Sequence, residues 1–88
     1  MLIQELTVLN ELGIHARVAS RLVRCANSFK SSVVAKKGGK EYDLKNVIGI
    51  MTLNAKCGES VTIEFEGEDE KEAAEAVKDL FEIKFGEK

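Results

Sequence analysis

Residues 61–81, VTIEFEGEDEKEAAEAVKDLF, change from one hydrophobic period to another within a few positions. Val61, Ile63 and Phe65 alternate with polar residues, which is typical of a strand with one buried face. Residues 67–69 end this strand. Beyond them the apolar side chains recur at helical spacing, and acidic residues fill the first turn, where the helix dipole favours them. The stretch therefore predicts a strand followed by a helix that Asp69 caps. The apolar stripe of that helix comprises Ala73, Ala74, Val77, Leu80 and Phe81.

The remaining strands are predicted by shorter signals toward the N-terminus. Apolar residues of one parity indicate a strand over residues 2–8. Residues 32–36 form a short run of β-type residues, and Gly38-Gly39 follows as a tight turn, because glycine tolerates the positive φ angles that such turns need. A partner strand around residues 40–43 would complete a hairpin.

Two further helices are expected between these strands. From Ala16 onward, apolar side chains return at helical spacing, and this helix should stop near residues 27–28. Residues 47–52 suggest a second, short helix with Asn46 as its N-cap.

The resulting order of elements is β-α-β-β-α-β-α. Elements this short can bury a core only as layers, with one sheet covered by helices on one face. We therefore predict a single α+β domain over residues 1–88, with a four-stranded antiparallel sheet and three helices on one face. The sequence contains no internal repeat and no low-complexity segment.

Composition excludes several classes of function. Hydrophobic residues make up 44% and charged residues 32% of the chain, and the net charge is -2. This balance is globular, and it provides no overall field for binding nucleic acid. No apolar run approaches the roughly 20 residues of a membrane span, and no basic segment followed by an apolar one marks a secretory signal. We expect a cytoplasmic protein that neither inserts into a membrane nor binds nucleic acid.

The cysteines give no sign of a redox or metal site. Cys25 and Cys57 are far apart and form neither a CxxC motif nor a disulfide framework. The chain has one histidine, so a zinc site would need carboxylates to complete it. We interpret both cysteines as reduced, structural thiols and expect no metal site.

The single histidine lies in the segment GIHARVA, residues 13–19, just before the first predicted helix. A neutral imidazole nitrogen is a competent nucleophile near neutral pH. Unpaired backbone N–H groups at a helix start, together with the guanidinium of Arg17, could hold the anionic phosphoryl group that such a nucleophile accepts. The same residues also fit a capping histidine without chemistry, or one that binds a carboxylate or a sulfate.

Residues 13–19 resemble the active-site signature of the HPr family, the histidine-containing phosphocarriers of the bacterial phosphoenolpyruvate-dependent sugar phosphotransferase system. The resemblance continues over essentially the whole chain, and the family's open-faced β-sandwich has the element order derived above. The matching positions are Asn27-Ser28-Phe29, Gly39-Lys40, residues 45–53, Gly58, Val61-Thr62-Ile63 and residues 67–70.

The resemblance implies a role for each residue of the motif. His15 would accept a phosphoryl group through Nδ1 from phosphorylated enzyme I and pass it to a IIA domain of a sugar permease. Arg17 would contact the phosphoryl oxygens, and the backbone N–H groups of Ala16 and Arg17 would add hydrogen bonds. The protein would be a monomeric, stoichiometric carrier that supplies positioning and charge compensation and needs no cofactor.

The resemblance also implies a docking patch beside the histidine. Apolar residues Val47, Ile48 and Met51 would contact the partners, and Arg17 and Arg24 would face acidic partner surfaces. Since a short amphipathic helix must also bury part of itself, we expect Val47 and Met51 to be partly exposed. On the same grounds, Ile50 or Leu53 should be buried.

Two positions depart from the family pattern. Val18 stands where the family usually has proline, and it restores an N–H donor that should loosen the helix start and weaken the site without abolishing it. Asn46 stands where regulated members carry a serine that a dedicated kinase phosphorylates. Asparagine caps a helix about as well as serine but has no hydroxyl group, so this regulation should not act through position 46.

Two alternative functions remain open. One is a regulatory protein of the same fold, which serves a nitrogen-type or incomplete phosphotransfer chain and moves no sugar. The other is a binding module of similar α+β type that is never phosphorylated. The intact pair of His15 and Arg17 argues against the second alternative.

Overall fold

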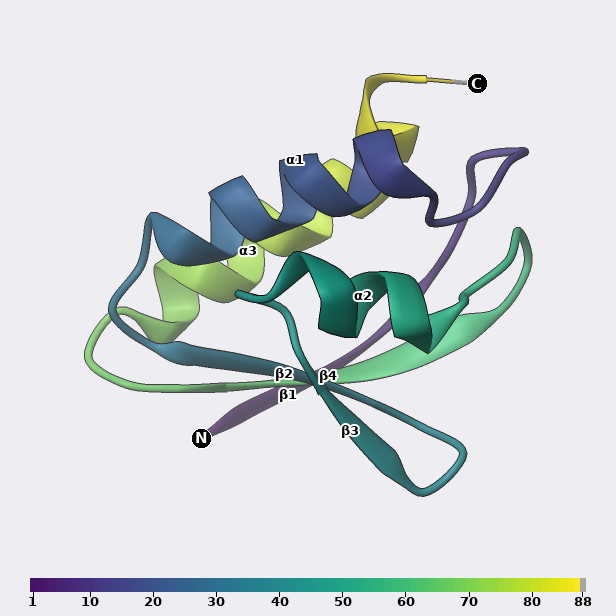
Figure 1. Cartoon of the computed structure of the whole chain (residues 1–88). Helices are drawn as coiled ribbons and strands as arrows, with labels where there is room; N and C mark the ends of the chain where they lie inside the picture. The colour runs from purple at the N-terminus through teal and green to yellow at the C-terminus, as the bar shows by residue number, and fades with distance from the viewer. Residues whose placement is uncertain (88) are drawn as a thin grey trace.

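Four strands form one antiparallel sheet in the computed structural model, which describes residues 1–87 (Figure 1). The strands follow the order β1-β4-β2-β3, so β4 lies between the first strand and the hairpin. Their bounds are Leu2–Thr7 for β1, Ser32–Lys37 for β2, Lys40–Asp43 for β3 and Ser60–Glu66 for β4. The predicted four-stranded antiparallel sheet is confirmed.

Three helices lie on one side of this sheet and leave its other face open (Figure 1). They are α1 (Ala16–Asn27), α2 (Val47–Leu53) and α3 (Glu70–Glu82), and a 3-10 turn, η1 (Lys84–Gly86), follows α3. None of the helices in residues 1–87 is long and apolar enough to cross a membrane. The open-faced arrangement is the one that the sequence predicts.

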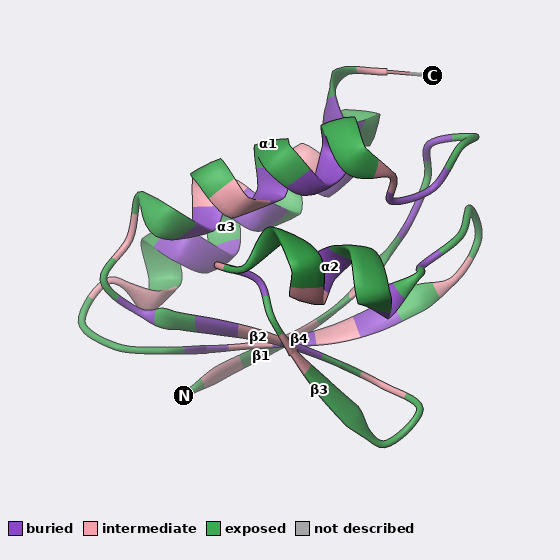
Figure 2. Ribbon diagram, in the orientation of Figure 1, coloured by how far each residue is buried: buried purple, intermediate pink, exposed green. Residues whose placement is uncertain are grey.

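The alternation in β4 sorts its side chains between the two faces. Val61, Ile63 and Phe65 are at most 1% exposed, whereas the intervening residues are partly exposed. Figure 2 shows the buried residues of the helices on the sides that face the sheet. The predicted apolar stripes of α1 and α3 are therefore the core surfaces. The stripe of α1 includes the fully buried Val18.

The hairpin between β2 and β3 turns at Gly38 and Gly39, whose φ angles are +59° and +79°. Two consecutive left-handed residues form the turn that matches the twist of a two-residue hairpin. The glycine pair therefore fixes the pairing of Lys37 with Lys40.

The prediction for Asp69 is confirmed in position but not in its capping contact. Asp69 is the N-cap residue of α3, but its side chain makes no capping hydrogen bond to the helix. Its carboxylate instead accepts hydrogen bonds from the backbone N–H groups of Lys30 and Ser31, each at 2.9 Å, and from the Ser31 hydroxyl. The carboxylate thereby connects the loop between α1 and β2 to the start of α3. Close by, the N–H of Gly67 donates a hydrogen bond to Glu70 Oε1 at 3.2 Å.

The sequence did not predict the turn η1. Lys84 and Phe85 adopt φ angles of +57° and +56°, which side chains other than glycine rarely do. Phe85 is nevertheless buried, with its ring centroid 4.8 Å from that of Phe81, and Arg21 donates a hydrogen bond to its carbonyl. As a result, η1 and Glu87 lie beside the beginning of α1 (Figure 1).

Candidate functional site

His15 is the N-cap residue of α1, and its extended backbone begins the helix. The first helical hydrogen bond runs from the N–H of Ala19 to the His15 carbonyl, at 2.8 Å. The N–H groups of Ala16, Arg17 and Val18 precede this bond and have no acceptor in the helix. The start of α1 therefore presents backbone donors beside the imidazole, as an anion site requires.

The loop before His15 is held by buried backbone contacts. Asn10 is fully buried, and its Nδ2 donates to the Gly13 carbonyl at 2.7 Å. The Ile14 N–H donates to the carbonyl of Ala55 at 2.9 Å. Gly13 has a φ of +69°, and a Cβ there would lie 2.7 Å from the same carbonyl oxygen. Only glycine fits at this position. Because these contacts restrain the backbone of the loop, they also fix the position of His15.

The other ring nitrogen of His15 has a carboxylate partner. His15 Nε2 lies 2.8 Å from Glu87 Oε1, and Asn10 Nδ2 donates to the same oxygen at 2.9 Å. The hydrogen bonds from His15 and Asn10 lower the pKa of Glu87, so this side chain is an ionised acceptor at neutral pH. Nε2 must therefore be the donor. Nδ1 makes no hydrogen bond with any residue of 1–87, so in the neutral ring it carries the lone pair.

Glu87 was not predicted from the sequence. It lies 72 residues from its partner and outside every periodic segment. The only hint was the apolar Phe85 just beyond the last predicted helix, which signals that the chain returns to the core.

Arg17 is exposed on the first turn of α1, and its guanidinium forms no hydrogen bond or ion pair within the described chain. Together with Glu11, Leu12 and Glu87 it lines a cavity of about 260 Å³. The structure thus brings Arg17, the free N–H groups and His15 together at one helix end, with the guanidinium available to an added anion.

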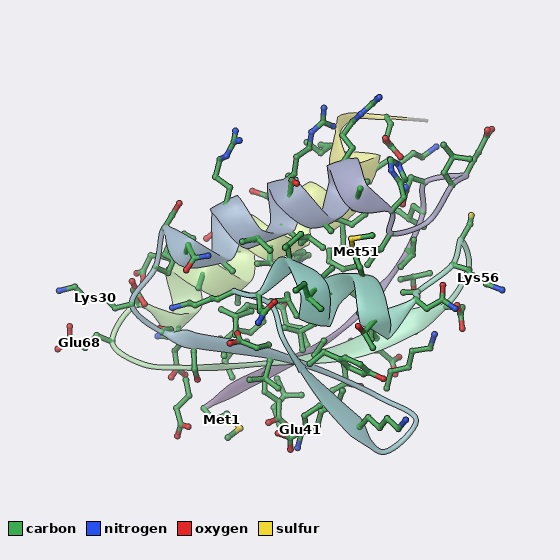
Figure 3. All side chains as sticks on the ribbon, viewed as in Figure 1. Met1, Lys30, Glu41, Met51, Lys56 and Glu68 are labelled. Carbon is green, nitrogen blue, oxygen red and sulfur yellow. The ribbon has the colours of Figure 1, made fainter. Side chains whose placement is uncertain are left out.

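The apolar residues expected for docking are exposed on α2. Val47, Ile48 and Met51 are 39%, 72% and 49% exposed, whereas Ile50 and Leu53 are buried as expected. Met51 lies on the side of α2 next to α1 (Figure 3). We refer to Val47, Ile48 and Met51 as the α2 patch.

The cap of α2 is also confirmed. Asn46 Oδ1 accepts hydrogen bonds from the N–H groups of Ile48 at 2.9 Å and Gly49 at 3.3 Å. The asparagine therefore does the structural work that a serine would do at the same position.

Arg24 lies elsewhere than the α2 patch. It lines a cavity of about 300 Å³ with Arg21 and Cys25 of α1, with Ser28 just after this helix, and with Leu80 of α3. No hydrogen bond or ion pair joins it to α2 within residues 1–87. The basic groups expected for docking therefore occupy two places, with Arg17 beside His15 and Arg24 at the groove between α1 and α3.

The structure also locates the cysteines. Cys25 and Cys57 are not bonded to each other, and partial burial raises the pKa of the Cys25 thiol. Among the described residues, no three His, Cys, Asp or Glu side chains gather as metal ligands would.

Comparison with known proteins places this site in context. A family model described as "PTS HPr component phosphorylation site" matches residues 3–82. The phosphocarrier protein HPr of Cupriavidus necator is 40% identical over 87 residues, which cover 99% of this chain and 98% of that protein. The corresponding protein of Xylella fastidiosa shows the same identity and coverage.

Solved structures show the same similarity. HPr-C-His from Thermoanaerobacter tengcongensis superposes with a TM-score of 0.95 at 39% identity, over 100% of this chain and 99% of that one. The phosphocarrier protein HPr from Bacillus anthracis gives a TM-score of 0.86 at 34% identity, over 91% of this chain and 95% of the other.

Proposed function

Because the chain belongs to the HPr family of phosphocarriers of the phosphotransferase system, we propose that His15 carries the phosphoryl group from phosphorylated enzyme I to the IIA domains of sugar permeases. The observation that carries this proposal is the position of His15 at the start of α1. There Nδ1 makes no hydrogen bond with any of residues 1–87, and the first N–H groups of the helix have no acceptor within the helix.

The nucleophile in this proposal is Nδ1. Glu87 accepts a hydrogen bond from Nε2 of His15, so in the neutral ring the proton is on Nε2 and the lone pair is on Nδ1. In the forward step, Nδ1 forms a bond to phosphorus as the bond from phosphorus to the donor nitrogen breaks. The donor recovers that electron pair, and no proton has to be exchanged with water.

The charge of the phosphoryl group is met by groups that are already in place. The N–H groups of Ala16 and Arg17 can donate hydrogen bonds to its oxygens. The positive end of the α1 dipole stabilises the negative charge of the phosphoryl group by about 0.3–1 kcal/mol. The Arg17 guanidinium is available for a charge-assisted contact. No metal ion is required, because positioning and fixed dipoles provide the stabilisation.

Val18 supports the helix start in a different way from proline. Its side chain is fully buried in the core, so the first turn of α1 is anchored by packing. We propose that this burial replaces the preorganisation that proline would provide. The N–H of Val18, which proline would lack, is one more donor near the phosphoryl group.

The α2 patch and Arg17 are the proposed contact surface for both partners. Exposed apolar side chains next to a reactive group suit a small, transient interface, and a methionine adapts to more than one partner surface. The groove at Arg24 would add a basic group for acidic partner surfaces.

The proposal is tested by phosphorylation and onward transfer. The protein is incubated with phosphoenolpyruvate and enzyme I, then mixed with either a sugar-permease IIA domain or a nitrogen-type IIA domain. Rapid transfer to the sugar-permease domain supports the proposal. Transfer only to the nitrogen-type domain would assign the chain to a regulatory phosphotransfer chain instead.

A further inference from the structure

The turn η1 is held against α1 by contacts that have nothing to do with phosphoryl binding. Phe85 is 1% exposed and packs its ring on Phe81, and the Arg21 side chain donates to the Phe85 carbonyl. Lys84 and Phe85 keep left-handed backbone angles that only surrounding packing can maintain. This combination fixes where residue 87 emerges.

From that position, Glu87 completes a chain of three side chains. The buried Asn10 and the ring of His15 both donate to Oε1 of Glu87, at 2.9 and 2.8 Å. Asn10 is itself held by its bond to the Gly13 carbonyl. The Glu87 carboxylate is therefore oriented from two sides and is only 15% exposed.

We propose that Glu87 is a positioning residue for phosphoryl transfer, which holds the His15 proton on Nε2 throughout the cycle. The effect of Glu87 on phosphoryl transfer rests on the proposed function, whereas its hydrogen bond to His15 is a feature of the structure. An imidazole in water exchanges its proton between the two nitrogens, and only the form protonated at Nε2 can attack through Nδ1.

The charges balance through the cycle. When Nδ1 bonds to phosphorus, the ring that retains its Nε2 proton becomes a cation. The anionic Glu87 offsets that charge at a distance of one hydrogen bond. When the phosphoryl group leaves, the electron pair of the bond to phosphorus returns to Nδ1 and the proton stays on Nε2. No acid or base has to act on the ring at either step.

Two variants separate orientation from charge. Glu87→Gln keeps an acceptor oxygen but removes the charge, and Glu87→Leu removes both. Glu82→Leu is the matched control, because Glu82 is an exposed residue at the end of α3. Thermal denaturation of each variant confirms that the fold is intact.

The first measurement is the ¹⁵N NMR spectrum of the His15 ring at neutral pH, which needs no phosphoryl donor. In the wild type and in Glu82→Leu, Nε2 should have the shift of a protonated nitrogen, with a proton that exchanges slowly. In Glu87→Leu the two ¹⁵N resonances should move toward each other and the Nε2 proton signal should vanish. Unchanged ring resonances in Glu87→Leu would overturn the proposal.

The second measurement is the single-turnover rate of phosphoryl transfer from phosphorylated enzyme I. Glu87→Leu should be slower than wild type by about tenfold, as expected for loss of a charge-assisted hydrogen bond, with Glu87→Gln between them. A wild-type rate in Glu87→Leu contradicts the positioning role and leaves the proposed function intact. If the wild type accepts no phosphoryl group, the proposed function fails, and the NMR result still decides what Glu87 does.

Discussion

The Asp69 carboxylate accepts a hydrogen bond from the backbone N–H of Ser31 at 2.9 Å. This contact joins the connection between α1 and β2 to the connection between β4 and α3. The carboxylate also accepts the Ser31 hydroxyl and the N–H of Lys30, and these hydrogen bonds lower the pKa of Asp69 to about 2 from 3.8. The ionised form is thus the one that the folded chain stabilises.

A pH-dependent loss of stability follows from this pKa. Because the pKa is lower in the folded chain than in the unfolded one, Asp69 stabilises the fold at pH values above 3.8, and this contribution disappears as the pH falls toward about 2. We expect Asp69→Asn to lower the melting temperature at pH 7. The difference between variant and wild type should narrow between pH 4 and 2 in thermal denaturation. A constant difference over that range would contradict this assignment.

Replacement of Gly13 should be much more costly than replacement of a glycine in open space. Gly13→Ala combines a left-handed backbone with a Cβ that would lie 2.7 Å from the Ala55 carbonyl oxygen, and it should cost about 3 kcal/mol or more. Gly38→Ala is the control, since Gly38 is also left-handed but has nothing within 4 Å of the added Cβ. That change should cost about 1–2 kcal/mol. Equal losses in urea denaturation would rule out the proposed close contact.

The Asn46 cap predicts a separation between stability and regulation. Asn46→Ala should cost about 1 kcal/mol of unfolding free energy, and Asn46→Ser should be close to wild type. With the family's serine kinase and ATP, only Asn46→Ser should gain a phosphate. Thr52 is the neighbouring alternative, although its hydroxyl already donates to the Ile48 carbonyl at 2.8 Å. Stoichiometric phosphate on Thr52 of the wild type would refute this prediction.

The elements and the position of His15 could be predicted because they depend on local patterns. The alternation around Ile63 and the spacing in α1 survive in the folded chain, since burial follows the same periods. The carboxylate contacts of Asp69 and Glu87 could not be predicted, because they join residues that are 38 and 72 positions from their partners. The return of the chain at Phe85 was missed for a related reason: tertiary packing overrides its backbone preference there.

The proposed docking surface can be tested without touching the imidazole. Ile48→Ser should raise the KM of enzyme I for this protein by about threefold to tenfold, with kcat and the free energy of unfolding unchanged, because the side chain is 72% exposed. Ile3→Ser is the control, since Ile3 is 58% exposed and lies on the open face of the sheet, opposite the face that the helices cover. Steady-state kinetics with varied amounts of the carrier provide the comparison. Equal effects of the two substitutions would exclude a specific role for the α2 patch.

The most direct test of the central claim is the intact mass of the protein after incubation with phosphoenolpyruvate and enzyme I. We predict an acid-labile gain of one phosphoryl group in the wild type and no gain in His15→Ala. The helix start should also bind the group less well in Arg17→Ala, which should therefore be phosphorylated more slowly. An unmodified wild type with several enzyme I proteins, or an equal gain in His15→Ala, would contradict the assignment of His15 as the phosphoryl carrier.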